Sequence, residues 1–141
     1  MPSVSITRLR VRKWRYLPWF VLWAARSARQ ARLAPGNLGV GLLRDHHNTF
    51  WTKTVWTDDA AMRAFMLSDP HKVAMPKLLD WCDEASLVRW RQDDTSLPSW
   101  TDAHRRLEQD GRPSKVNHPS DAHRALKFPP PKWSEPQRNA S

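Results

Sequence analysis

Residues 38–57 read LGVGLLRDHHNTFWTKTVWT, and this stretch decides the fold. Residues 49–57 are rich in threonine, valine and aromatic side chains, which is typical of a β-strand. Residues 38–44 form a second apolar run, in which Gly39 and Gly41 could let another backbone or a ligand approach. The four polar residues between the two runs, 45–48, predict a turn, so we expect a β-hairpin here.

A strand and a helix precede the hairpin. Ser3–Val11 (SVSITRLRV) is rich in β-branched residues. Its apolar positions change phase after Ile6, which suits a strand that is buried on both faces or contains a bulge. From Leu17 to Ala31 apolar residues recur at helical spacing, with arginines mostly on the opposite side. Pro35 and the glycine after it are expected to end this helix.

A second helical region and a last strand follow the hairpin. Residues 57–59 (TDD) supply a helix cap and an acidic first turn. Residues 68–70 (SDP) restart a helix that includes His71, and we expect Pro76 to kink or divide it. Residues 84–91 (EASLVRWR) predict the final strand.

The order strand, helix, hairpin, helix, strand is the βαββαβ plan of a ferredoxin-like α+β domain, which we assign to residues 1–92. Residues 93–141 hold seven of the twelve prolines and few large apolar side chains. We therefore expect a disordered, proline-rich C-terminal tail. A short helix is compatible with residues 101–110, and Trp100 and Leu107 could dock onto the domain.

The positive charge is confined to the first third of the chain. Residues 1–44 contain nine Lys or Arg and no acid, while the remaining 14 basic and 14 acidic residues cancel, so the net charge of +9 lies here. Such asymmetry fits nucleic acid, an anionic membrane surface or a merely solvated helix face, and we favour the last. The apolar run 16–25 is too short to span a membrane, and we read it as part of the domain rather than as a secretory signal. We expect a cytoplasmic protein without a membrane span.

Several kinds of site lack support in the sequence. Cys82 is the only cysteine, so neither an intrachain disulfide nor a cysteine metal cluster can form. Asp83 and Glu84 beside it would raise the pKa of its thiol, and no GxSxG or glycine-rich phosphate loop is present. His46 and His47 are adjacent in the predicted turn and would point to opposite sides, so we expect no dedicated metal site there.

Three segments together carry a family resemblance: VSITRLRVRKWRYLP (residues 4–18), APGNLGV (34–40) and FWTKTVWTDDAAMRAFMLSDPHKVAMPKLLDWCDEA (50–85). With them, residues 3–91 resemble the antibiotic-biosynthesis-monooxygenase-like superfamily of dimeric α+β barrels. They are similar in particular to uncharacterised members related to spheroidene monooxygenase. The matching signature is a strand ending in Trp56, the acidic helix start at Asp58 and Asp59, and residues 68–71 (SDPH).

The resemblance implies a homodimer in which two sheets pair into a barrel, with a cavity between sheet and helices in each protomer. Some members are cofactor-free oxygenases of aromatic substrates and others bind or degrade haem, so the expected cofactor is either none or haem. His71 is the candidate catalytic residue, as a proton-transfer group or as the ligand of haem iron. The alternative is that His71 is only an exposed or capping residue at a helix start.

The candidate ligand-binding residues are Arg8, Arg10, Phe50, Trp51 and Trp90. Arg8 and Arg10 share one face of the first strand and could hold a carboxylate, or they could only protect a sheet edge. Phe50 and Trp51 belong to the hairpin, and we expect such bulky groups to lie exposed on the sheet face without helices, where a second protomer would cover them.

These observations predict a small homodimeric barrel that binds a planar apolar or aromatic ligand, a monooxygenase-like protein by resemblance. Whether it is an enzyme is left open. The alternative is a non-enzymatic binding protein whose basic N-terminal half contacts nucleic acid or an acidic partner.

Overall fold

The structure is a computed structural model that describes residues 1–68 and 71–113, with the side chains of residues 71, 74 and 79 outside this description. Its elements in chain order are β1 (Ser3–Val11), the 3₁₀ turn η1 (Trp14–Tyr16), α1 (Leu17–Leu33), β2 (Asn37–Asp45), β3 (Thr49–Trp56), α2 (Asp59–Leu67), α3 (His71–Trp81), β4 (Cys82–Arg91), α4 (Trp100–Asp110) and β5 (Arg112–Pro113). Residues 114–141, most of the predicted tail, lie outside the described part.

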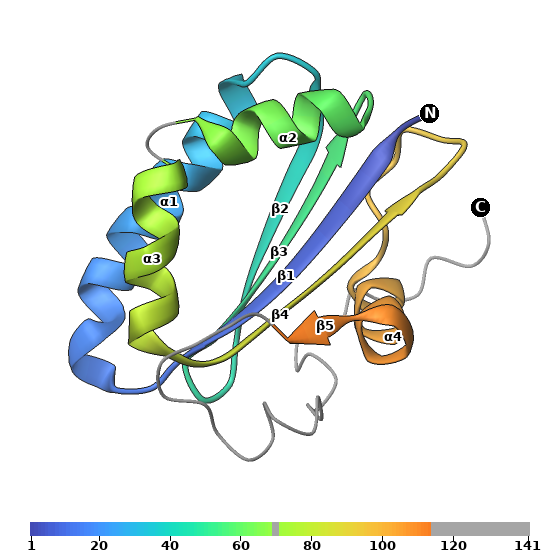
Figure 1. Cartoon of the computed structure of the whole chain (residues 1–141). Helices are drawn as coiled ribbons and strands as arrows, with labels where there is room; N and C mark the ends of the chain where they lie inside the picture. Colours follow the sequence, from blue (N-terminus) through green and yellow to red (C-terminus); the bar gives the residue numbers. More distant parts are fainter. Residues whose placement is uncertain (69–70, 114–141) are drawn as a thin grey trace.

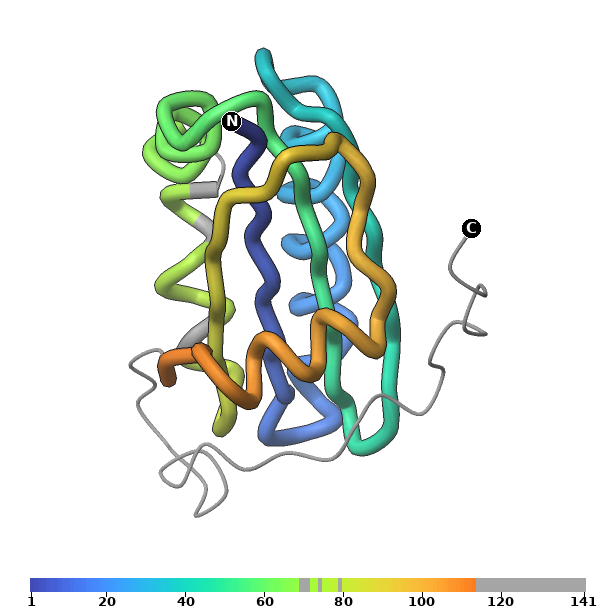
Figure 2. The backbone as a smooth tube through the Cα atoms, turned by 90° about the vertical axis from the view of Figure 1, so that its right-hand side faces the viewer, coloured from blue at the N-terminus to red at the C-terminus, as the bar shows by residue number. Residues whose placement is uncertain are grey.

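One antiparallel sheet with the strand order β2-β3-β1-β4-β5 forms the middle layer. Helices α1, α2 and α3 cover one face of this sheet, and α4 crosses the other face (Figures 1 and 2). The predicted ferredoxin-like α+β fold is therefore confirmed. Within the described residues no helix is both long enough and apolar enough to cross a membrane.

Strand β1 lies between β3 and β4 in the centre of the sheet, which explains its sequence. Val4 and Ile6 are buried on the α4 side, whereas Leu9 and Val11 pack with the helical layer. The register against β4 shifts between Arg10 and Val11. Both interpretations of the phase change are thus correct, because β1 is covered on two faces and is irregular at its end.

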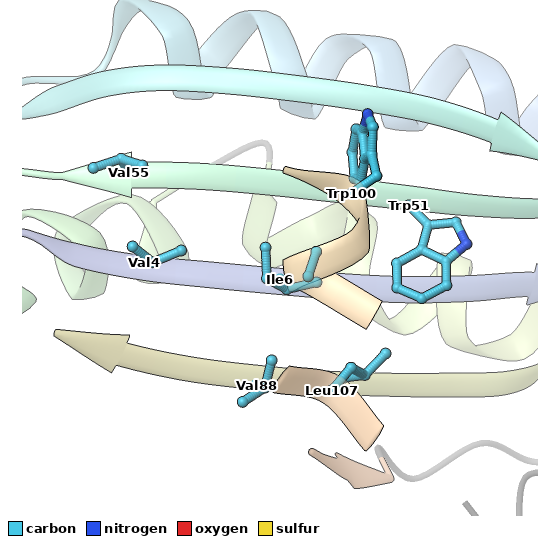
Figure 3. Close-up of a cluster of buried hydrophobic side chains, with 8 residues drawn as sticks. Val4, Ile6, Trp51, Val55, Val88, Trp100 and Leu107 are labelled. Atoms are coloured by element: carbon cyan, nitrogen blue, oxygen red, sulfur yellow. The ribbon is translucent and has the colours of Figure 1, made fainter. Parts of the chain in front are cut away.

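Helix α4 gives the second face of the sheet its own core. Trp100, Ala103 and Leu107 project from one side of α4 at helical spacing onto the sheet. There they meet the cluster of buried strand residues drawn in Figure 3, which consists of Val4, Ile6, Trp51, Val55 and Val88. The expectation that Phe50 and Trp51 lie exposed on an uncovered face is therefore wrong, because Trp51 is fully buried in the core that α4 completes and Phe50 packs against Phe20 on the helix-covered face.

Local signals fix the starts of the helices. The Asp58 side chain caps α2 by accepting a hydrogen bond from the amide of Ala61 at 2.8 Å. Ser99 caps α4 in the same way through the amide of Asp102 at 3.1 Å. Pro76 does not divide the second helical stretch, because α3 continues through it. The start of α2 therefore has the cap that the sequence predicted within residues 57–59, and α4 starts at a serine cap of the same kind.

Candidate functional site

A cavity of about 340 Å³ lies between the sheet and the helical layer. Its floor comes from β1, β2, β3 and β4, and its roof from α1, α2 and α3. The volume falls within the range of small-molecule sites, about 300–1,000 Å³. Exposed lining residues on α1 and β2, such as Val21 and Leu42, show that the cavity reaches solvent.

Apolar side chains make up most of the wall. Phe20 of α1 packs against Phe50 of β3 with ring centroids 4.7 Å apart. Trp56 stacks on Phe65 of α2 at 5.1 Å. The methionines of the lining are Met62, Met66 and Met75. Flat rings together with flexible thioethers suit a planar apolar ligand, because methionine adapts its shape to what it contacts.

Four hydroxyl groups form a compact polar patch on the floor of this apolar cavity. Ser5 and Thr7 come from β1, and Thr54 and Thr52 stand directly opposite them on β3. The hydroxyl oxygen of Thr54 accepts a hydrogen bond from the indole nitrogen of Trp56 at 3.0 Å. Hydroxyls can donate and accept, so the patch can orient the polar edge of a ligand.

Arg89 of β4 also lines the cavity and remains exposed to solvent. Burial lowers the pKa of its guanidinium, and the positive charges of Arg112 and Arg63 lower it further, against the attraction of Asp59. Within the described residues Arg89 forms no ion pair, and its side chain donates to the sulfur of Met66 at 3.0 Å. An anionic ligand group would relieve the repulsion between these arginines.

The structure separates the predicted ligand-binding residues onto two faces of the sheet. Phe50 lines the cavity. Trp51 borders the cavity as well, but its ring belongs to the buried cluster that also contains Trp100 and Leu107 of α4. Arg8 pairs with Trp51 and Arg10 with Thr49 across the sheet, so both arginines point to the α4 side, as does Trp90, whose partner is Val4.

Arg8 and Arg10 are both engaged by a carboxylate on that second face. Glu84 of β4 accepts from Arg8 at 2.7 Å and from Arg10 at 2.6 Å, and the side chains of Arg8 and Glu84 are 5% and 4% exposed. Burial alone would raise the pKa of Glu84, but the hydrogen bonds and charges of the two arginines outweigh it and hold that pKa below its ordinary value. Both guanidinium groups are thus engaged by a carboxylate of the chain itself, on the sheet face opposite the cavity.

His71 is the first residue of α3, but its side chain lies outside the described part of the structure. A catalytic or haem-ligating role for His71 thus stays a prediction, and so does haem itself. None of the described lining residues is a histidine, aspartate or glutamate. The described wall therefore offers binding groups and cations, not a general base.

Other chemistry finds little support among the described residues. Cys82 is buried, and burial together with the charge of Asp83 raises the pKa of its thiol, which is protonated at neutral pH. The part of the chain that the structure describes contains no group of three His, Cys, Asp or Glu side chains placed to hold a metal ion.

Solved structures with the same architecture define the class. SnoaB, a cofactor-independent oxygenase from Streptomyces nogalater, is 22% identical, with a TM-score of 0.53 over 67% of this chain and 95% of its own. An antibiotic biosynthesis monooxygenase is 16% identical, with a TM-score of 0.59 over 67% and 100%. Rv0793 from Mycobacterium tuberculosis is 11% identical, with a TM-score of 0.60 over 68% and 100%.

These likenesses establish the fold, because the chain shares the ferredoxin-like α+β architecture of these structures, which include monooxygenases of antibiotic biosynthesis, as the resemblance indicated. The family model described as "Domain of unknown function (DUF3291)" matches residues 20–116, and the chain belongs to this family. Among curated proteins none matches it. The finer relation to spheroidene monooxygenase stays a prediction.

Sequence reasoning did not single out Arg89 or the four hydroxyls of the cavity floor. The alternation of side chains between the two faces of a strand carried a signal for these residues. Residues two apart on a strand share a face, so Arg89 shares the helix-covered face with Leu87. Which face the helices cover, however, could not be read from β4 alone.

Proposed function

We propose that the cavity between sheet and helices binds a planar apolar or aromatic ligand that carries an anionic or acidic group, and that the chain is a monooxygenase-like protein. The observation that carries the proposal is the apolar cavity with its hydroxyl floor and the cation Arg89 in its lining. Apolar walls with a few convergent polar groups are the usual composition of small-molecule sites.

For oxygen chemistry without a cofactor, the substrate must itself form a stabilised carbanion. A guanidinium beside the ligand would favour the anionic form of such a substrate electrostatically. Arg89 is placed for that role, and the hydroxyls of Ser5, Thr7, Thr52 and Thr54 could orient the substrate oxygens. The likeness in fold to cofactor-independent SnoaB supports this reaction class.

Two fluorescent naphthalene probes test the site, because they differ only in a sulfonate. We expect the protein to bind both 8-anilino-1-naphthalenesulfonate and neutral N-phenyl-1-naphthylamine. Arg89→Met should weaken sulfonate binding about tenfold or more, the size of a lost charge-assisted hydrogen bond, and leave the neutral probe unchanged. Ala28→Phe, which places a ring in the lining, should weaken binding of both probes.

The matched control is Ala60→Phe on the exposed side of α2, which should bind both probes as the wild type does. If the two probes bound Ala28→Phe as tightly as they bind the wild type, the proposed cavity site would be contradicted. An oxygen electrode with planar polycyclic phenols, whose phenolates carry carbanion character on the ring, then tests the oxygenase assignment, for which oxygen consumption is expected with at least one substrate that also displaces the probe.

We further propose a homodimer, on the resemblance to the dimeric barrels. Helix α4 covers the sheet face that such barrels pair, so pairing would need α4 to become part of the interface. Light scattering at micromolar concentration should give twice the chain mass of 16.5 kDa. A mass equal to one chain would contradict the dimer.

A further inference from the structure

The outer side of α1 and the preceding turn η1 carry exposed apolar side chains. Trp14, Trp19, Leu22 and Leu33 are 78%, 59%, 41% and 74% exposed. Figure 1 shows α1, in blue, in the outer helical layer away from α4. Large aromatic and aliphatic groups gathered on one surface require an explanation beyond solubility.

Five exposed residues of α1 form one stripe. Trp19, Leu22, Arg26, Arg29 and Leu33 follow spacings of three and four, so they share a face of the helix. The face opposite holds the buried residues of α1, which are Phe20, Ala28 and Ala31. With Trp14 and Arg15 of η1, this stripe is called the α1 outer surface below.

Among the described residues, no acid forms an ion pair with the cations of the α1 outer surface. Residues 1–44 contain no Asp or Glu. Within the described residues, Arg15, Arg26 and Arg29 form no ion pair. The guanidinium of Arg26 lies 5.3 Å from the Trp23 ring, so it lies alongside aromatic surface. The surface therefore combines large apolar groups with positive charge that no described acid pairs.

We propose that the α1 outer surface binds an anionic lipid bilayer, with α1 lying in the plane of the membrane interface. A helix that packs one face on its domain and presents tryptophan, leucine and arginine on the other has the pattern of helices that bind at a membrane interface. Nucleic acid would use the arginines and could stack on the tryptophans, but it offers nothing to Leu22 and Leu33. A second copy would set Arg26 and Arg29 against like charges.

The bilayer would also be close to the cavity. Val21 and Ala25, on the flank of the same helix, are exposed and line the cavity. A membrane-bound orientation therefore brings this part of the cavity lining to the lipid surface, from which an apolar ligand could enter. Binding of the bilayer itself does not depend on what the cavity holds.

Co-sedimentation of the full chain with vesicles tests the proposal. We expect binding to vesicles of equal parts phosphatidylcholine and phosphatidylglycerol, and much weaker binding to phosphatidylcholine alone. Arg26→Gln combined with Arg29→Gln should weaken binding about 25-fold, since each arginine near an anionic surface contributes about fivefold. Trp19→Ser combined with Leu22→Ser should also weaken it, and this loss should persist at high salt.

The control is Arg63→Gln combined with Arg105→Gln, which makes the same charge change on exposed positions of α2 and α4. It should bind vesicles as the wild type does, and unchanged melting temperatures should show that all variants fold. Equal loss in the control and in the α1 variant would overturn the proposal. Retention of the wild type on single-stranded nucleic acid without binding to vesicles would also overturn it. So would a variant with Trp19→Ser and Leu22→Ser that loses self-association but binds vesicles as the wild type does.

Discussion

Leu107→Ala should lower the free energy of unfolding by about 2–5 kcal/mol, the usual cost of removing a buried leucine side chain. Leu107 is fully buried between α4 and the sheet, in one cluster with Ile6 and Trp51. Its loss would leave a void at the centre of the second core, which rigid strands cannot close. Urea unfolding followed by far-ultraviolet circular dichroism measures the change.

Leu67→Ala removes the same atoms from a leucine that is 65% exposed at the end of α2. It should change the stability by less than about 0.5 kcal/mol, as surface substitutions usually do. If Leu107→Ala were equally mild, α4 would not belong to the folded core, and the sheet face beneath it would be free for a second protomer.

Glu84→Gln should lower the free energy of unfolding by about 3–5 kcal/mol, because it leaves the buried Arg8 without the carboxylate that it shares with the partly exposed Arg10. The matched control is Glu108→Gln. Glu108 is exposed on α4 and lies 3.6 Å from His104, so its loss should cost less than about 1 kcal/mol. A cost for Glu84→Gln as small as the control's would show that the ion pairs contribute no net stability.

The difference between wild type and Glu84→Gln should depend on pH. The arginines hold the pKa of Glu84 below its ordinary value of about 4.5, so its stabilisation is complete above that pH and is lost as the pH falls through the folded-state pKa. Asp83 acts in the opposite direction, because burial raises its pKa despite the attraction of Arg10, and its protonation favours the folded state. Unfolding curves from neutral pH down to about pH 3 should therefore show the two proteins converging in stability. A constant difference across this range would contradict the role of the Glu84 charge.

The local elements could be predicted because their signals are short-range. The hairpin over residues 38–57, the cap at Asp58 and the helix with arginines on its outer side all depend on neighbours within a few residues. The phase change in β1 predicted a strand buried on both faces or one with a bulge, and the structure shows both features.

The second core was harder to predict, because α4 is mostly polar. Only Trp100, Ala103 and Leu107 are buried, among eight other residues that are charged, polar or partly exposed. Composition therefore predicted a tail with at most a short helix over residues 101–110 and with Trp100 and Leu107 able to dock, and the structure shows both that helix and the docking. The stabilisation that these three residues provide depends on a matching apolar face, which is formed mainly by strands about fifty or a hundred residues away in sequence.

The sequence by itself determined the βαββαβ order, the basic first helix and the absence of a disulfide, because these follow from local pattern and composition. Only the tertiary structure decided which face of the sheet each side chain serves. Strand pairing places Arg8 and Arg10 against Glu84, and it leaves Arg89 with the hydroxyls of Ser5, Thr7, Thr52 and Thr54 in the cavity lining. The physical reason is that alternation along a strand defines two faces but does not say which layer will cover each one.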